Sequence, residues 1–204
     1  RNILAIPVIV GRKTARERFA GAANTMTCEA IMRDGKALQM GTSHELGQRF
    51  SRAFNISFST AEGTVEHCWT TSWGASTRML GGLIMCHGDD YGLVLPPAVA
   101  PIQAVVVVVK ESDGAVTRAA STLVDDLSAV GVRTRLDDDV SHGFGWRVTE
   151  WDLQGVPIRV EIGPREVGDN AGVLYRRDTR QKSTVSLDSL VDEVRRLASR
   201  IQAE

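Results

Sequence analysis

The sequence predicts two modules in tandem, an α+β antiparallel sheet with helices followed by a small α/β domain. Short apolar runs separated by turn residues in the first half are typical of hairpins. Prolines between residues 96 and 101 then interrupt the pattern, because proline extends neither a strand ladder nor a helix. Beyond them, the unbroken run from Ala104 to Val109 is typical of a strand buried on both faces. We therefore expect domains at residues 1–98 and 99–204.

Length and composition indicate a globular protein with room for two hydrophobic cores. The chain has 204 residues, of which 43% are hydrophobic and 24% charged. Its formal net charge of −1 excludes the uniformly basic field of a histone-like protein, so any contact with nucleic acid must come from local patches. No stretch has the apolar length of a membrane span or the layout of a signal peptide. Because the sequence does not begin with Met, we expect it to be part of a longer protein.

The cysteines favour a reducing environment. Cys28, Cys68 and Cys86 lie far apart and form no C-x-x-C pair, so neither a disulfide nor a structural zinc site is expected. His67 and Cys68 are neighbours, but adjacent side chains on a strand point to opposite faces and do not readily share one ion. A cytoplasmic location is the simplest setting.

Two helix-start patterns stand among the hairpins of the first half. A strand is expected over 3–10, and the capping-box spacing of Thr14 and Glu17 predicts a short helix that ends by Gly21. Segments 25–33 and 36–40 are expected to pair across an Asp-Gly turn.

A second capping box, Thr42 to Glu45, predicts another helix. Its buried stripe would comprise Leu46, Phe50 and Phe54, at four-residue steps. A hairpin of 56–59 with 67–71 and an apolar helix over 77–87 complete the first module.

The second half predicts alternating strands and helices. The expected helices are 116–130, 145–153 and 187–201, and the expected strands after the valine run are 133–136, 158–162, 172–177 and 183–185. The last helix is the clearest, because its apolar residues keep helical spacing while acids come early and arginines late. The acidic run Asp137 to Asp139 is expected to be a solvated loop, with a magnesium or partner site as the alternative.

The stretch from Ser72 to Gly92 has the composition of a nucleotide site. Small and hydroxyl residues let a backbone approach a ligand, and Arg78 follows them at the start of an apolar, glycine-punctuated helix. A guanidinium can stack on a purine and also bind phosphate oxygens in a forked geometry. The alternative is an ordinary surface arginine.

Several motifs together resemble one family. The strings Q-M-G-T-S-H-E-L-G-Q at 39–48, S-W-G-A-S-T-R at 72–78 and G-L-V-L-P-P at 92–97 resemble the catalytic domain of class II prolyl-tRNA synthetases of the archaeal and eukaryotic type. Residues 145–165 resemble the anticodon-binding domain of the same family. The resemblance covers almost the whole chain, and it implies that 1–98 is the later part of a class II catalytic domain and 99–204 the anticodon-binding domain.

The resemblance also implies roles for individual residues of the first module. Arg78 would be the catalytic residue, stacking on adenine and reaching the γ-phosphate of ATP. The other implied contacts are Gln39, Thr42 and Ser76 with ATP, Gln39 with a magnesium ion, and Phe19 and His44 with the proline ring. The plain alternatives are a helix cap for Thr42, ordinary core for Phe19 and a solvent-facing side chain for His44.

In the second module the resemblance points to anticodon recognition. Asp152, Arg159 and Arg165 would recognise the guanines of a proline anticodon, since a carboxylate accepts from N1 and N2 of guanine and Arg donates to O6 and N7. The alternatives are a local pair or cap for Asp152 and a solvent-facing strand position for Arg159. A basic cluster that would meet phosphates comprises Arg176, Arg177, Arg180 and Lys182.

The implied function is a ligase that makes prolyl-adenylate from L-proline and ATP and transfers proline to tRNA(Pro). The family's first two motifs are expected before residue 1, so this chain alone should not activate proline, and a homodimer is expected to form through that earlier portion. One alternative is a catalytically inactive, synthetase-derived module that binds tRNA or nucleotide and regulates another process. Another is a threonyl-type synthetase, against which the lack of a Cys/His zinc triad argues.

Overall fold

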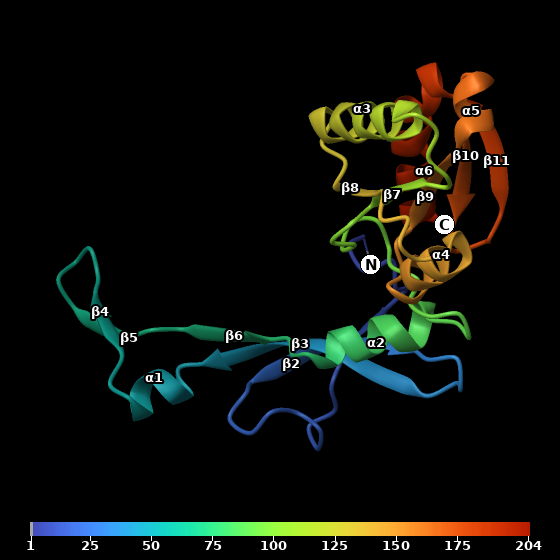
Figure 1. Cartoon of the computed structure of the whole chain (residues 1–204). Helices are drawn as coiled ribbons and strands as arrows, with labels where there is room; N and C mark the ends of the chain where they lie inside the picture. Colours follow the sequence, from blue (N-terminus) through green and yellow to red (C-terminus); the bar gives the residue numbers. More distant parts are fainter. Residues whose placement is uncertain (1) are drawn as a thin grey trace. The chain divides into compact units, whose positions relative to one another are not determined.

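The computed structural model describes residues 2–204, which fall into two compact units. The N-terminal unit is Ile6–Cys86, and the C-terminal unit comprises residues 2–5 together with His87–Glu204. Figure 1 shows the elements of both units along the chain. The division falls at His87, before the proline-rich segment where the sequence places the domain boundary. Residues 87–98 therefore pack as part of the C-terminal unit.

An antiparallel sheet dominates the N-terminal unit. Its strands, in spatial order, are β1 (Ile9–Arg12), β2 (Asn24–Ile31), β3 (Ala37–Gly47) and β6 (Thr70–Gly74). The short strands β4 (Ser57–Ser59) and β5 (Val65–His67) form a separate hairpin. Helices α1 (Arg49–Ala53) and α2 (Arg78–His87) follow β3 and β6. The antiparallel sheet, the first predicted hairpin and the apolar helix are confirmed. The second hairpin pairs 57–59 with 65–67 rather than with 67–71, because Thr70 and Thr71 belong to β6, which pairs with β3.

The register of β2 and β3 sets which side chains share a face. Thr25 pairs with His44 and Thr27 with Thr42, so these four side chains lie on one face, here called the threonine face. A bulge between Cys28 and Glu29 of β2 leaves one residue of β3, Met40, without a partner. Because of that extra residue, Gln39 opposite Glu29 returns to the threonine face.

Helix α2 packs on the opposite face of the same sheet. A Cβ atom added at Gly82 would lie 2.8 Å from Sδ of Met40 and 3.2 Å from Cδ2 of Leu38, so the helix approaches the sheet closely at this glycine. Gly82 and Leu83 are the buried residues of the helix. Only this side of α2 packs against β3, since Leu80, Ile84 and Met85 are exposed.

Two predicted helices of the N-terminal unit are wrong. Residues 14–21 form turns in which the amides of Glu17 and Arg18 both donate to the carbonyl of Thr14. The second capping box lies within β3, and α1 begins only at Arg49. Pairing with β2 and β6 satisfies the backbone of this segment, and this tertiary pairing outweighs the local cap pattern. The first strand also lies later than expected, at Ile9–Arg12.

The C-terminal unit contains a mixed five-stranded sheet in the spatial order β11-β10-β9-β7-β8. The strands are β7 (Ala104–Val108), β8 (Thr134–Asp137), β9 (Ile158–Ile162), β10 (Ala171–Arg176) and β11 (Lys182–Ser186). Strand β7 is parallel to β8 and β9, whereas β10 is antiparallel to both of its neighbours. The helices are α3 (Ala115–Ala129), α4 (Phe144–Leu153), α5 (Pro164–Gly168) and α6 (Leu190–Ala203), with a 3-10 turn at Leu187–Ser189.

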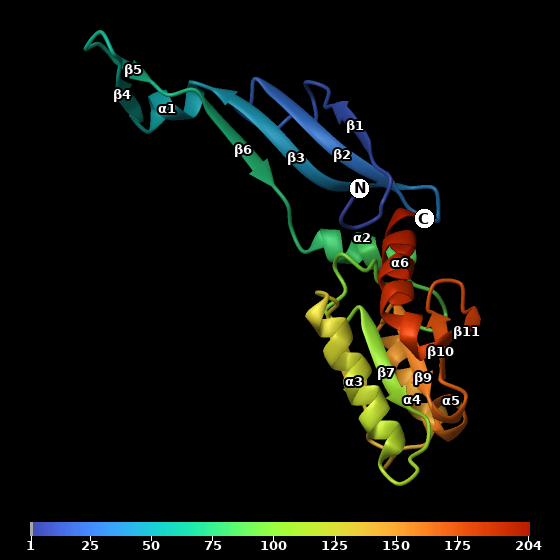
Figure 2. The same cartoon turned by 90° about the horizontal axis from the view of Figure 1, so that it is seen from above.

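The two faces of this sheet differ in what covers them. Helices α3 and α6 lie along the sheet in Figure 2. Their side chains join those of β7, β9 and β10 in the main hydrophobic core on one face. On the other face, Val105 and Val107 pack with Phe144 and Trp151 of α4. The predicted elements of this half are confirmed, and α5 is the helix that sequence reasoning missed. Within the described residues, no helix is long and apolar enough to cross a membrane.

Residues 89–95 are fixed to the end of α4 by their backbone. The amide of Leu93 donates to the carbonyl of Leu153 at 3.1 Å, and the amide of Leu95 donates to the carbonyl of Gly155 at 3.2 Å. Gly92 has a φ of +131°, and a Cβ atom there would lie 2.5 Å from Cα of Leu153. This segment therefore needs a glycine for both its conformation and its packing.

Replacement of Gly92 by alanine is expected to destabilise the C-terminal unit by at least about 2 kcal/mol, because a methyl group would collide with backbone atoms that cannot rotate away. Gly131→Ala is the matched control, since Gly131 also has a positive φ, +84°, but open space around its Cβ position. Urea denaturation followed by tryptophan fluorescence measures both variants. Equal losses in the two would contradict the collision and leave only backbone strain.

Candidate functional sites

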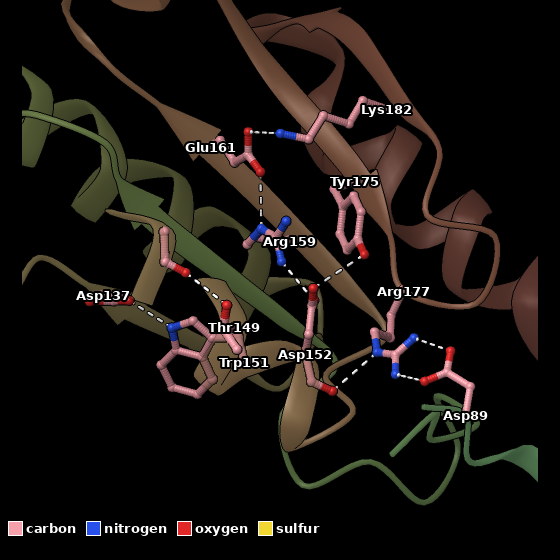
Figure 3. Close-up of polar contacts among 11 residues, drawn as sticks. Asp89, Asp137, Thr149, Trp151, Asp152, Arg159, Glu161, Tyr175, Arg177 and Lys182 are labelled. Atoms are coloured by element: carbon pink, nitrogen blue, oxygen red, sulfur yellow. Dashed lines mark hydrogen bonds and ion pairs between the residues drawn. The ribbon is translucent and has the colours of Figure 1, made fainter. Parts of the chain in front are cut away.

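A polar cluster occupies the face of the C-terminal sheet beside α4. Arg159 and Glu161 alternate along β9 with Ile158, Val160 and Ile162, which belong to the main core. Alternation sends the two charged side chains to the opposite face, where Tyr175 of β10 lies next to Arg159. Figure 3 shows these side chains together with Asp152, from the last turn of α4, and Lys182 of β11.

Arg159 and Asp152 form the centre of this cluster. Nη1 of Arg159 donates to Oδ1 of Asp152 at 2.8 Å, and its Nε donates to Oε1 of Glu161 at 3.0 Å. Lys182 donates to the other oxygen of Glu161 at 2.7 Å (Figure 3). Arg159 is buried, whereas the Asp152 side chain is 22% exposed. The carboxylate of Asp152 is therefore the part of this pair that solvent, or a ligand, can reach.

Tyr175 completes the support of this ion pair. The guanidinium carbon of Arg159 lies 3.9 Å from the centre of the Tyr175 ring, and the tyrosine hydroxyl donates to Oδ2 of Asp152 at 3.4 Å. Burial, and then the negative charge of Asp152, raises the pKa of Tyr175, so the hydroxyl keeps its proton and remains a donor. Asp152 is thus oriented from two sides.

The predicted anticodon residues are only partly brought together. Asp152 and Arg159 are in direct contact, so the alternative of a solvent-facing Arg159 is wrong, while a local pair for Asp152 is what the structure shows. Arg165 lies apart on α5, with its side chain 87% exposed and 3.7 Å from Asp169. Tyr175 and Glu161 were missed. The alternation of charged and branched residues in P-I-R-V-E-I was the pattern that could have revealed Glu161.

Three members of the predicted basic cluster are already paired, Arg176, Arg177 and Lys182. Arg176 contacts Asp178 and Glu204, both at 2.7 Å, and these partners raise its pKa. Arg177 is buried against Asp89. Arg180 lies 3.9 Å from the centre of the Tyr91 ring. The cluster is therefore not a uniform phosphate-binding patch, and Lys182, half exposed, is the member that pairs with Glu161.

The predicted acidic loop is also wrong at its first residue. Asp137 is buried, and its Oδ1 accepts from Nε and Nη2 of Arg147 at 3.0 and 2.7 Å. Its Oδ2 accepts from Nε1 of Trp151 at 2.6 Å (Figure 3). Arg147 also donates to the carbonyl of Val108 at 2.8 Å. These contacts fix α4, and with it Asp152, to the ends of β7 and β8.

Asp89 and Arg177 form a second ion pair beside Asp152. Nη1 and Nη2 of Arg177 donate to the two oxygens of Asp89 at 2.8 and 2.5 Å, and Nε donates to the backbone carbonyl of Asp152 at 3.1 Å (Figure 3). The hydrogen bonds from Arg177 hold the pKa of Asp89 at about 2, below its ordinary value of 3.8. Asp89 therefore stays ionised in mildly acidic solution.

The lowered pKa of Asp89 predicts that part of the free energy of unfolding is lost in acid. A carboxyl group with a lowered pKa in the folded state contributes stability above its unfolded pKa, and that contribution is lost as the pH falls from about 4 towards 2. The unfolding free energy of the wild type is expected to fall more steeply over this range than that of Asp89→Asn. Urea denaturation at pH 2 to 5 measures it, with the exposed Asp90→Asn as control. Parallel curves for wild type and Asp89→Asn would contradict the assignment.

On the threonine face of the N-terminal sheet, His44 is the centre of a smaller network. Its Nδ1 lies 2.9 Å from Oγ1 of Thr25, and its Nε2 lies 3.1 Å from Oγ1 of Thr42. The Phe19 ring is 5.1 Å from the His44 ring, and the two rings are tilted by 43°. The structure thus brings together Phe19, Thr42 and His44, although His44 lies on a strand rather than the expected helix. Thr25 was missed.

Gln39 extends this face, but its surroundings do not form a resident metal site. Its side-chain oxygen accepts a hydrogen bond from the ammonium group of Lys13. A cation at the same oxygen would be repelled by that ammonium group, and across the described residues no cluster of three His, Cys, Asp or Glu side chains could hold a metal ion. The residues present therefore do not fit a bound magnesium ion at Gln39.

Ser76 and Arg78 lie at the start of α2. The hydroxyl of Ser76 accepts from the amide of Arg78 at 3.3 Å, and both side chains are exposed. Helix α2 packs on the face of the sheet opposite to His44, and a hollow of about 370 Å³ on that face is lined by residues that include Met26, Cys28 and Trp73. No hydrogen bond or ring contact within the described part of the chain joins Arg78 to His44.

The comparisons with known proteins agree on one family. Residues 103–197 match the family model described as the anticodon binding domain. The proline–tRNA ligase of Acetoanaerobium sticklandii is 49% identical over 203 residues, which are 100% of this chain and 42% of the relative. The proline–tRNA ligase of Frankia casuarinae is 52% identical over 203 residues, again 100% of this chain and 43% of the relative. Over its whole length, this chain is similar to part of each of these proline–tRNA ligases.

A third relative, proline–tRNA ligase 2 of Clostridioides difficile, is 49% identical over 193 residues, which are 95% of this chain and 40% of the relative. The chain thus spans about two fifths of the length of the proline–tRNA ligases it matches. The expected resemblance to prolyl-tRNA synthetases and to their anticodon-binding domain is confirmed at this level. The residues matched by the family model include the whole cluster around Asp152, and also Arg177, but not its partner Asp89.

Proposed function

We propose that these residues form the tRNA-recognising part, and some of the amino-acid-activating part, of a proline–tRNA ligase. Such an enzyme joins the carboxylate of L-proline to the α-phosphate of ATP and then transfers proline to tRNA(Pro). The observation that carries the proposal is the identity of about 50% to proline–tRNA ligases, which extends through both units. The class II catalytic assignment of residues 1–98, the anticodon assignment of 99–204 and the archaeal and eukaryotic subclass belong to this proposal.

The threonine face is proposed to hold the reactants of the first step. Thr25 and Thr42 contact the two ring nitrogens of His44, which fixes the plane of the imidazole, and Phe19 supplies a second ring beside it. Two rings held in this way suit the methylene groups of a five-membered pyrrolidine ring.

The nucleotide-binding residues are proposed from the same resemblance. Gln39, Thr42, Ser76 and Arg78 would contact ATP, with Arg78 placing positive charge against the phosphates while the carboxylate attacks. Because the surroundings of Gln39 do not fit a resident metal ion, magnesium is proposed to enter with the phosphates of ATP.

In the C-terminal unit, the Asp152 cluster is proposed to recognise the anticodon guanines. The exposed carboxylate of Asp152 would accept from guanine N1 and N2, with Arg159 beside it and Arg165 approaching from α5. A homodimer formed through residues outside this chain and a cytoplasmic location complete the proposal.

Proline-dependent exchange of pyrophosphate into ATP tests the activation step. We expect the full-length gene product that contains these residues to catalyse the exchange, and Arg78→Ala to lower its rate at least tenfold by removing charge from the developing transition state. Arg195→Ala, on an exposed position of α6, is the control. An absence of exchange would favour the alternative, a synthetase-derived module that binds tRNA or nucleotide without catalysis. Exchange that is indifferent to Arg78→Ala would remove Arg78 from the site.

A further inference from the structure

Arg177 is a buried cation with two kinds of partner. It is 0% exposed, its two terminal nitrogens donate to both oxygens of Asp89, and its Nε donates to the backbone carbonyl of Asp152. A buried guanidinium without a counter-ion costs several kcal/mol, so Arg177 needs a carboxylate at all times. In the native arrangement that carboxylate is Asp89.

Asp89 is itself held in place for this pairing. The amide of Tyr91 donates to Oδ1 of Asp89 at 2.9 Å. The backbone amide of Asp89 donates to the carbonyl of Gly92 at 3.0 Å. The contacts of Leu93 and Leu95 with the end of α4 then anchor the segment. The geometry of the ion pair between Asp89 and Arg177 is therefore fixed before any ligand binds.

Asp152 is the carboxylate that would replace Asp89. Apart from Asp89, it is the acid whose charge acts on Arg177, and Arg177 already touches its backbone. Its carboxylate is directed instead to Arg159 and Tyr175, where it keeps 22% of its side chain exposed. Without the charge of Asp89, Arg177 would attract the Asp152 carboxylate away from that position.

We propose that Asp89 is a positioning residue for base recognition: by neutralising Arg177, it leaves the Asp152 carboxylate free to face a guanine of the tRNA anticodon. This role rests on the proposed function of the Asp152 cluster, and it lies outside the residues matched by the anticodon-domain model. It makes the segment that follows α2 a determinant of RNA specificity without touching RNA.

RNA hairpins with the anticodon arm of tRNA(Pro) test this role. The measured quantity is the ratio of dissociation constants for hairpins with an altered and with the native anticodon guanine, from fluorescence anisotropy at fixed salt. We expect Asp89→Asn to reduce this ratio about tenfold. Asp89→Glu, which keeps the charge, should restore most of it. Asp90→Asn, at the exposed neighbouring position, should leave it unchanged.

A double variant separates positioning from folding. In Asp89→Asn combined with Arg177→Met, no buried cation remains to attract Asp152, so discrimination should recover relative to Asp89→Asn alone. If the double variant discriminates no better than the single one, the positioning role is overturned and Asp89 serves the fold. If Asp152→Ala abolishes discrimination but Asp89→Asn retains it, the role of Asp89 is overturned while the proposed function stands. A wild type without guanine preference would overturn both.

Discussion

Replacing Asp152 by alanine is expected to reduce the preference for guanine in the proline anticodon by roughly 10- to 100-fold. A carboxylate that accepts from two donors on one edge of a base contributes about 1 to 3 kcal/mol of discrimination. The same change leaves Nη1 of the buried Arg159 without its acceptor at 2.8 Å, while Nε of Arg159 keeps its hydrogen bond to Glu161. Charging of tRNA(Pro) transcripts with altered anticodon guanines by the full-length gene product measures the effect as a ratio of kcat/KM values.

Two further variants define what Asp152 does. Asp152→Asn keeps the shape of the side chain but has one acceptor in place of two, so it should lose nearly as much discrimination as Asp152→Ala. Asp125→Ala, at an exposed position of α3, is the matched control and should behave as wild type. If charging of native tRNA falls while the ratio between native and altered transcripts is unchanged, Asp152 supports the fold and does not recognise bases.

Replacing Asp137 by alanine is expected to destabilise the C-terminal unit by about 3 to 5 kcal/mol, because it leaves the buried Arg147 without its counter-ion. Trp151 loses its hydrogen-bond acceptor in the same step. Urea denaturation followed by tryptophan fluorescence is well suited, since Trp151 itself reports on the site.

Asp138→Ala is the matched control, because the neighbouring residue is exposed and carries the same charge. It is expected to change the unfolding free energy by no more than about 0.5 kcal/mol. A loss below about 1 kcal/mol for Asp137→Ala would show that the pair with Arg147 contributes little beyond the fold's other contacts.

The C-terminal unit could be predicted well because its patterns are tied directly to burial. The valine run of β7 is buried throughout, and the apolar spacing of the last helix matches the side chains that α6 contributes to the core. Helix α5 was missed because it has one short turn and no apolar stripe. Where a pattern is a direct consequence of packing, the sequence alone was enough.

The N-terminal unit shows where local patterns fail. Thr42 and Glu45 have the spacing of a helix cap, yet the hydroxyl of Thr42 contacts His44 within β3. The strand pairing that decides this involves β6, which follows after an intervening helix and hairpin, and no local window contains that information. The bulge at Met40, which returns Gln39 to the threonine face, is equally non-local.

The predicted site residues show the same contrast between local patterns, which the sequence reveals, and long-range contacts, which it does not. The contact of Asp152 with Arg159 depends on how far α4 runs along the sheet, which sequence spacing does not specify. Arg165 was grouped with them by sequence resemblance, but α5 turns its side chain into solvent. Asp89 and Arg177 are 88 positions apart, and only the folded chain shows that they are partners.

The contact of Gln202 has a consequence for how the chain matures during translation. Its side-chain amide donates to the carbonyls of Asn2 and Ile3, and its oxygen accepts from the amide of Ala98. Asn2 and Ile3 leave the ribosome before the N-terminal unit, yet Gln202 is made 200 and 199 residues after them. The carbonyl of Leu4 can meet Nε2 of His87 earlier, but the carbonyls of Asn2 and Ile3 gain their hydrogen bonds only once α6 has been synthesised, so the last turn of that helix completes the C-terminal unit.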